Sequence, residues 1–232
     1  MCFSAEASFA GAAVVGACGI GSLALVRDKR EIPFAALPFA FGIHQALEGF
    51  TWLDLRGLPD ASLNGWAVHL WVLFAWALLP TWVPLAVWLI EPDPRRKRIM
   101  LGLLAVGVAL TAFMLTQAFQ PSIEVRVIAD NLDYVLPFSA SWALALPYVA
   151  ATCLTPAIST RPYVMVFGIG NFLAMSAAAV IKAADYSSIW CTFAAFLSII
   201  IFAHMFTEWR RTRPGAGDPR PISPTSPAVP AP

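Results

Sequence analysis

Seven long apolar stretches divide this chain, and the basic residues between them fall almost entirely into alternate gaps. A helix needs about 20 predominantly apolar residues to cross the hydrocarbon core of a bilayer, and each stretch is close to that length. Hydrophobic residues make up 59% of the 232 residues and charged residues only 12%, against about 25% charged in soluble domains. The sequence therefore predicts an all-α integral membrane protein built as a bundle of seven transmembrane helices.

The seven predicted spans cover residues 5–26, 32–53, 66–90, 99–119, 138–158, 163–183 and 189–209. The third span is the longest and contains Pro80 and Pro84. Proline inside a helix removes a backbone hydrogen bond and is a common cause of kinks. We therefore expect the third helix to be kinked or tilted.

The basic residues predict how the bundle is oriented. The gaps after the first, third, fifth and seventh spans hold twelve of the 15 Lys and Arg residues, and only Arg56, Arg126 and Lys182 lie elsewhere. The positive-inside rule then places the amino terminus outside and the carboxyl terminus in the cytoplasm. These features predict a multi-pass plasma-membrane protein whose partner is the lipid bilayer. The net charge of +1 gives no support to a nucleic-acid partner.

The chain divides into a transmembrane domain, residues 1–209, and a carboxyl-terminal tail, residues 210–232. The tail contains RPGAGDPRPISPTSPAVPAP, which is rich in Pro, Ala and Ser and almost lacks large apolar side chains. Such a composition cannot form a packed core. We therefore expect a disordered cytoplasmic tail.

A different kind of segment, QPSIEVRVIADNLDYVLP, separates the fourth and fifth spans. Its first half alternates apolar Ile123, Val125 and Val127 with charged Glu124 and Arg126, the period of a half-buried strand. The following Ala-Asp-Asn favours a turn, after which Asp-Tyr-Val can return as a second strand. A short extracytoplasmic hairpin over the outer mouth of the bundle is predicted here.

Polar side chains inside the spans are the candidates for chemistry, because burying them in a bilayer is costly. Glu48 lies in FGIHQALEGFTWL, about 8 Å below the outer interface at 1.5 Å per residue. His44 lies one turn deeper on the same helix face, and Gln45 is beside them. His69 enters the third span from outside, at a depth of about 5 Å. We expect an outer-half pocket centred on Glu48, with His44 and His69 as partners and Lys182 at its rim.

This pocket favours a protein that binds a small molecule, a lipid or an ion, because a carboxylate at that depth needs a partner, a cation or a proton. Two alternatives stay open. One is a membrane-embedded hydrolase that holds a divalent metal through His44, Glu48 and His69. The other is a structural or accessory subunit in which these polar groups only join helices. HExxH and CxxC motifs are absent, so the sequence leaves open whether the chain is an enzyme.

The four cysteines fall at two depths. Cys2 in MCFSAEASF and Cys191 in SSIWCTF both lie at the outer face, where an oxidising compartment allows two thiols to form a disulfide. Cys18 and Cys153 match each other in the inner half, where buried free thiols are the usual state. The sequence thus predicts a bridge between Cys2 and Cys191.

Aromatic and amide side chains complete the pattern. The third span carries five tryptophans, which we interpret as interfacial belts and lipid-facing anchors; they are Trp66, Trp71, Trp76, Trp82 and Trp88. Asn171 in the sixth span is expected to make a hydrogen bond between helices. Gly168 and Gly170 beside it predict a close backbone approach.

Three segments carry a resemblance to a known family: the opening MCFSAEASF, FGIHQALEGFTWL and the late IWCTFAAFLS. Together they resemble a family of uncharacterised small multi-pass membrane proteins of bacteria and archaea, over most of the chain except the tail. This resemblance implies no activity. The three His and several Ser are also similar to those of the seven-helix ceramidase and receptor-like hydrolases, which bind zinc. The chain lacks their paired HxxxH in the last span and their mid-membrane Asp, so that similarity supports only the hydrolase alternative.

Overall fold

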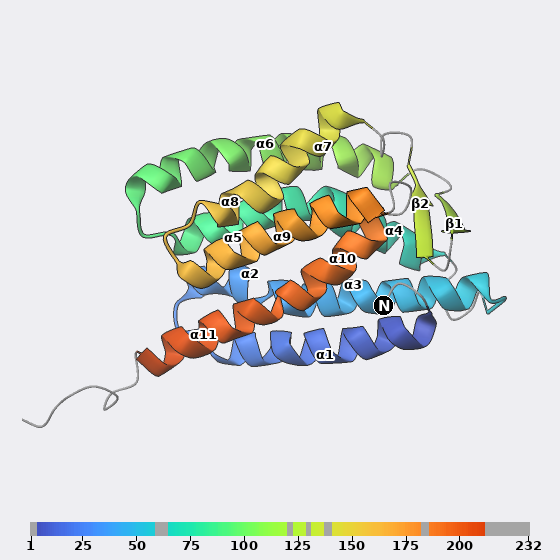
Figure 1. Cartoon of the computed structure of the whole chain (residues 1–232), viewed down its shortest axis with the longest axis horizontal. Coiled ribbons are helices and arrows are strands. Elements are labelled where there is room, and N and C mark those ends of the chain that lie inside the picture. The colour runs from blue at the N-terminus through green and yellow to red at the C-terminus, as the bar shows by residue number, and fades with distance from the viewer. Residues whose placement is uncertain are drawn as a thin grey trace, which may run out of the picture.

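The structure is a computed structural model, and it describes residues 4–58, 65–119, 123–128, 131–136, 141–181 and 186–211. It is a bundle of long helices with a small β-hairpin at one end (Figure 1). The helices are α1 (Ala5–Ala24), α2 (Ile32–Ala35), α3 (Leu37–Leu55), α4 (Trp66–Val72), α5 (Leu79–Ile90), α6 (Pro94–Ala118), α7 (Trp142–Val149), α8 (Thr155–Ala157), α9 (Pro162–Ile181), α10 (Tyr186–Leu197) and α11 (Ile199–Arg211). The predicted tail beyond Arg211 lies outside the described residues.

The helical segments fall into the seven stretches that the apolar pattern marks, and the all-α class is confirmed. Four helices are long and apolar enough to cross a membrane: Ala5–Ala24, Trp66–Ile90, Pro94–Ala118 and Thr192–Arg211. Two shorter apolar helices, Ala143–Ala157 and Pro162–Ala178, follow the same pattern. The helix α3, with 19 residues, is not among these six helices, and it carries the polar residues of the predicted pocket.

The first two long helices, α1 and α3, pack with their backbones almost in contact. A Cβ added at Gly19 would lie 2.2 Å from the backbone nitrogen of Phe39, and one added at Gly42 would lie 2.7 Å from the Cα atom of Gly16. No Cβ atom fits at either position, so both require glycine. Close approach of this kind at small residues is common between membrane helices. This packing fixes one face of α3 against α1 and turns the adjoining face toward the interior.

Two π-helical segments, Leu73–Leu78 and Ala150–Leu154, interrupt the third and fifth helical stretches. Each is followed at once by a helix with proline at its second residue, Pro80 in α5 and Pro156 in α8. Proline cannot donate a backbone hydrogen bond and clashes with the preceding turn, and a wider π turn relieves that clash. The distortion expected at Pro80 therefore takes the form of a π-helical segment.

Side-chain hydroxyls from neighbouring helices bind carbonyl groups of the first π segment. Tyr148 Oη donates to the carbonyl oxygen of Ala75, and Thr111 Oγ1 donates to that of Ala77 at 2.5 Å. Hydroxyl donors are a common way to satisfy backbone groups that a distorted helix releases. The irregular turn is thereby tied to both α6 and α7.

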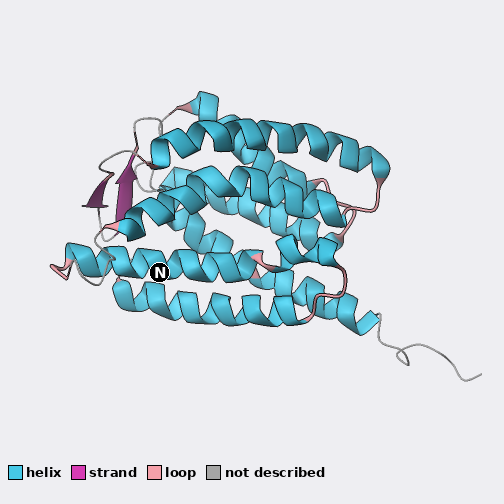
Figure 2. Ribbon diagram, turned by 180° about the vertical axis from the view of Figure 1, so that it is seen from behind, coloured by secondary structure: helices cyan, strands magenta, loops and turns pink. Residues whose placement is uncertain are grey.

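The predicted hairpin is present. Strand β1 (Glu124–Ile128) pairs antiparallel with β2 (Asn131–Val135), with Arg126 opposite Asp133. The burial is the reverse of what the alternating first strand suggested, because β1 is mostly exposed and β2 packs against the bundle. Figure 2 shows both strands at one end, away from the turn between α5 and α6. Strand β2 is therefore part of the hydrophobic core at that end.

The core runs along the bundle in two clusters of buried side chains. One, at the hairpin end, includes Trp71 and Trp76; the other includes Phe34 and Phe167. The prediction that all five tryptophans of the third stretch are lipid-facing is wrong for two of them: Trp71 is 0% exposed and Trp76 8%, whereas Trp66 is 57% exposed. These two lie on the helix face shared with small alanines, which faces the bundle interior.

Candidate functional site

Three polar side chains on two successive turns of α3 lie in the interior, in the half of the bundle that carries the hairpin. We call His44, Gln45 and Glu48 the polar cluster; their exposed fractions are 0%, 1% and 0%. Helix α3 is in contact with α1, α4 and α10, so this face is enclosed by protein on several sides. Charged and amide side chains are rarely buried so completely. Their burial singles out this part of α3 as the candidate site.

Aromatic rings connect the polar cluster to the hairpin. The His44 ring stacks on Trp71 with 4.8 Å between centroids, and its centroid is also 4.8 Å from that of Phe74. Trp71 in turn stacks on Tyr134 of β2, at 3.7 Å and an interplanar angle of 7°. Stacked rings at these separations have a preferred relative geometry. The column from Tyr134 to His44 holds the imidazole in place and excludes solvent from one side of it.

Several polar atoms of this region have no hydrogen-bond partner among the described residues. They include both ring nitrogens of His44 and both amide heteroatoms of Gln45, together with Nε1 of Trp71. Buried polar groups in native proteins are nearly always bonded, and each one left unsatisfied costs about 1–3 kcal/mol. His44 and Gln45 thus present donors and acceptors that the described protein groups do not use.

The sequence-predicted partners of Glu48 are only partly brought together. His44 and Glu48 share the inward face of α3, as their spacing predicts. His69 instead lies half-buried on α4, with Nδ1 3.2 Å from the carbonyl oxygen of Gly65 and its ring near Trp66. Within the described residues, no group of three or more His, Cys, Asp or Glu side chains is placed to hold a metal ion. His44, Glu48 and His69 do not form such a group, and their role as metal ligands stays a prediction.

The structure does not describe the side chains of three other predicted residues. Lys182 and Cys2 lie outside the described residues, and the side chain of Cys191 is not described. The rim position of Lys182 and the Cys2–Cys191 bridge therefore stay predictions. Cys18 and Cys153 are free thiols, as expected.

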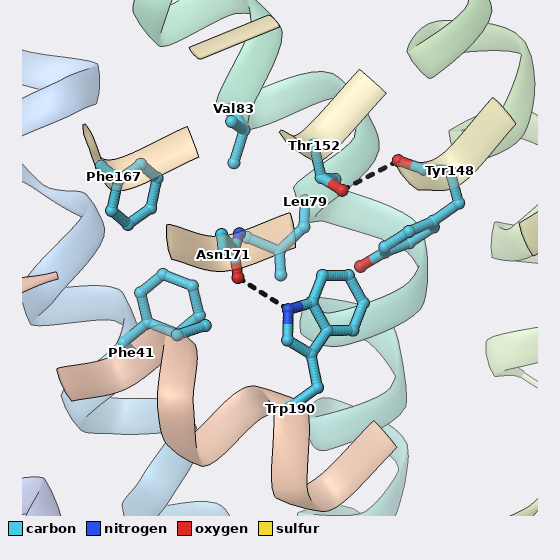
Figure 3. Close-up of a pocket in the computed structure, with 9 residues that line it drawn as sticks. Phe41, Leu79, Val83, Tyr148, Thr152, Phe167, Asn171 and Trp190 are labelled. Atoms are coloured by element: carbon cyan, nitrogen blue, oxygen red, sulfur yellow. Dashed lines mark hydrogen bonds between the residues drawn. The ribbon is translucent and has the colours of Figure 1, made fainter. Parts of the chain in front are cut away.

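A small cavity lies in the middle of the bundle, one turn along α3 from His44 (Figure 3). It offers about 10 Å³ to the centre of a water molecule, which is space for about one water. Its lining residues are Phe41, Leu79, Val83, Tyr148, Thr152, Phe167, Asn171, Trp190 and Ala194.

The polar groups around this cavity bond to protein. Trp190 Nε1 donates to Asn171 Oδ1 at 2.6 Å, which confirms the interhelical bond expected of Asn171. Thr152 Oγ1 donates to the carbonyl oxygen of Tyr148 at 2.8 Å. The close approach expected near Asn171 is also present, since a Cβ at Gly168 would lie 2.3 Å from the backbone nitrogen of Ala157. Asn171, Trp190 and Thr152 at the central cavity thus bond to protein, unlike His44 and Gln45 of the polar cluster.

A second buried carboxylate, which the sequence analysis missed, joins two turns at the opposite end. Glu91 is 2% exposed and accepts hydrogen bonds from Ser159 Oγ at 2.7 Å and from Thr160 N and Oγ1 at 2.9 and 2.7 Å. Burial works to raise the pKa of Glu91, but these bonds from Thr160 and Ser159 outweigh it and hold the pKa below its ordinary value. Its position between an apolar helix and Pro92 gave no sequence signal for these distant donors.

Trp71 and Tyr134 were also missed as parts of the site. Asn131 and Tyr134 are buried on β2 at 0% and 2% exposed. Buried Leu132 and Tyr134 alternate with Asp133, and this alternation is a signal that could have marked β2 as the inward strand.

Comparison with known proteins places the chain in a family. No curated protein and no solved structure matches it. The model of a family of unknown function, DUF6629, matches residues 1–217, a range that includes every described helix and strand. This agrees with the resemblance to an uncharacterised family that the sequence motifs carry. The chain belongs to the family of unknown function DUF6629.

Proposed function

We propose that this chain is a multi-pass plasma-membrane protein with seven spans, its amino terminus outside and its carboxyl terminus in the cytoplasm. Four long apolar helices support this reading. The placement of basic residues supports the orientation: Arg30, Lys97 and Arg161 come from three different turns and line one cavity at the end opposite the hairpin. An excess of Lys and Arg at one end of a bundle marks its cytoplasmic side. The hairpin then lies on the outer side.

Within this frame, we propose that the polar cluster binds a small cation that enters from the hairpin side. The observation that carries the proposal is the complete burial of His44 and Gln45 with no hydrogen-bond partner for their heteroatoms among the described residues. An imidazole nitrogen and an amide oxygen are cation ligands or hydrogen-bond acceptors. Glu48 is fully buried on the same face of α3, and carboxylates inside membrane proteins commonly mark ion pathways.

Binding of a cation separates this reading from its alternatives. A structural role would leave the polar cluster indifferent to added ions, and the hydrolase alternative has no assembled metal set within the described residues. Anything that binds the folded state raises its stability, by about 2.7 kcal/mol when the ligand is at 100 times its dissociation constant. Thermal stability is therefore a readout that needs no known transport or catalytic activity.

The experiment uses the purified full chain in detergent, with unfolding followed by tryptophan fluorescence. NaCl, KCl and NH4Cl are compared with choline chloride at one ionic strength. We expect at least one small cation to raise the melting temperature of the wild type, and the double variant His44→Phe/Gln45→Leu to lose that response. Thr152→Val, which alters a satisfied polar group near the central cavity, is the matched control and should keep it.

The opposite pattern would refute the binding proposal. If His44→Phe/Gln45→Leu is more stable than the wild type, and none of the three cations stabilises either protein over choline, the polar cluster is a dispensable contact between helices. Buried polar groups of that kind are often replaced by apolar residues with no loss of stability.

A further inference from the structure

A cavity of about 320 Å³ opens at the end of the bundle opposite the hairpin. Three turns of chain form it: the turn before α2, the turn between α5 and α6, and the turn between α8 and α9. Its charged lining residues comprise three basic and three acidic side chains, which are Arg30, Lys97, Arg161, Asp28, Glu31 and Glu91. Their formal charges cancel, so the character of the cavity depends on which of them already have partners.

The acidic side chains are occupied by donors from the protein. Asp28 Oδ1 accepts from the backbone nitrogen of Arg30 at 2.9 Å. Glu31 Oε2 accepts from the backbone nitrogens of Arg27 and Asp28 at 3.1 and 3.3 Å, which closes a capping box around the 3₁₀ turn Lys29–Glu31. Glu91 is held by Ser159 and Thr160, as described above. Each carboxylate keeps its negative charge, but these bonds hold it against backbone or hydroxyl groups, and none of the three makes an ion pair with Arg30, Lys97 or Arg161.

The cationic side chains, in contrast, keep donors available. The guanidinium of Arg30 is exposed and makes no hydrogen bond or ion pair with a described residue. Lys97 Nζ lies 4.8 Å from the ring centroid of Trp88, a cation–π contact that leaves its N–H groups available. Arg161 uses Nε for the carbonyl oxygen of Ile90 at 2.9 Å, and its Nη1 is 3.9 Å from Glu208. The cavity therefore keeps cationic N–H groups that no described residue uses.

We propose that this cavity binds the phosphate of an anionic lipid headgroup. Guanidinium and ammonium groups together are suited to phosphate oxygens. Trp88 and Leu89 lie beside the cations at the end of α5, where an indole and an apolar side chain suit the interfacial part of a lipid. Basic pockets between helices on the cytoplasmic side are known to hold such headgroups. The inference rests on the proposed membrane orientation, but not on cation binding by the polar cluster.

The test measures lipid binding to the full chain in detergent by native mass spectrometry, with phosphatidylglycerol, phosphatidylcholine and inorganic phosphate as probes. The variant Arg30→Gln/Lys97→Gln removes two cations of the cavity. Its matched control, Arg95→Gln/Arg98→Gln, removes the same charge from exposed positions of α6 that do not line the cavity. We expect one phosphatidylglycerol to be retained by the wild type, and the first variant to bind it about 25-fold more weakly, since each cation near an anionic headgroup contributes about fivefold.

Three results would overturn the proposal. An equal loss in both double variants would mean diffuse attraction, equal retention of phosphatidylcholine would mean no recognition of charge, and displacement of the lipid by equimolar inorganic phosphate would mean a free-phosphate site. If the double variant does not fold, the single variant Arg30→Gln replaces it, with an expected loss of about fivefold. His44→Phe/Gln45→Leu should bind phosphatidylglycerol like the wild type, which separates failure here from failure of the polar-cluster proposal.

Discussion

Replacing Glu91 tests how strongly one buried carboxylate holds the basic end of the bundle together. Its Oε1 accepts from Asp93 N at 3.1 Å and Thr160 Oγ1 at 2.7 Å, and its Oε2 from Thr160 N at 2.9 Å and Ser159 Oγ at 2.7 Å. In Glu91→Gln the amide NH2 must face one of these two pairs. The hydroxyl of that pair can rotate and accept, but the backbone N–H cannot. One backbone donor is therefore left facing another donor in either orientation.

The expected cost follows from that single mismatch. Leaving a buried donor unsatisfied costs about 1–3 kcal/mol, so Glu91→Gln should lower the free energy of unfolding by about 2 kcal/mol near neutral pH. Glu91→Ala, which loses all four bonds but lets water reach the donors, should cost about 3 kcal/mol. Unfolding in mixed detergent and SDS micelles measures both, and the exposed Glu124→Gln, in the hairpin, is the control.

The pH dependence of the same pair gives an independent check. The pKa of Glu91 in the folded protein lies below its ordinary value of 4.5, because its hydrogen bonds outweigh burial. A carboxyl group with a depressed folded-state pKa stabilises the protein above its unfolded-state pKa, and that contribution is lost as pH falls through the folded-state value. The stability gap between wild type and Glu91→Gln should therefore be full near neutral pH and shrink below pH 4.5. A gap under about 0.5 kcal/mol near neutral pH, or one that does not change on acidification, would refute this account.

Three further outcomes are expected. Gly107→Ala should lower the melting temperature strongly, because its Cβ would lie 1.8 Å from the carbonyl oxygen of Pro80; an unchanged melting temperature would show that α5 and α6 can separate freely. Reporter fusions in the turn at 91–98 should report cytoplasm, as the basic residues there require, and a periplasmic signal would reverse the proposed orientation. If Cys2 and Cys191 form a bridge, non-reducing electrophoresis of the wild type should show a faster band that Cys191→Ser lacks; identical mobility would discard the bridge.

Local patterns in the sequence were enough to predict the helical stretches and the shared face of His44 and Glu48. Each depends on spacing within one segment: about 20 apolar residues for a helix, and four residues for one turn of it. The hairpin was also predicted from its alternation, because strand period is local.

The features that could not be predicted depend on contacts between distant segments. Tryptophan is a residue type common among lipid-facing anchors, and only the stacking of Tyr134 from the hairpin on Trp71 makes Trp71 a core residue. His69 is near the depth of Glu48, but depth does not fix the rotation of α4, which turns His69 toward Gly65 and Trp66. Glu91 finds its donors almost 70 residues away, at Ser159 and Thr160. Rotation and partner choice are set by packing, which single-sequence patterns do not contain.

The π-helical segment Leu73–Leu78 has a mechanical consequence for the whole molecule. It separates the half of the helix 66–90 that bears Trp71 from the half that bears Trp88. The regular ladder of backbone bonds is interrupted there, so the two halves are joined through a segment that also bonds to α6 and α7. Each half contacts one of the two proposed sites. If a ligand at one end changes the affinity of the other end for its own ligand, thermodynamic reciprocity requires that the second ligand change the affinity of the first by the same factor.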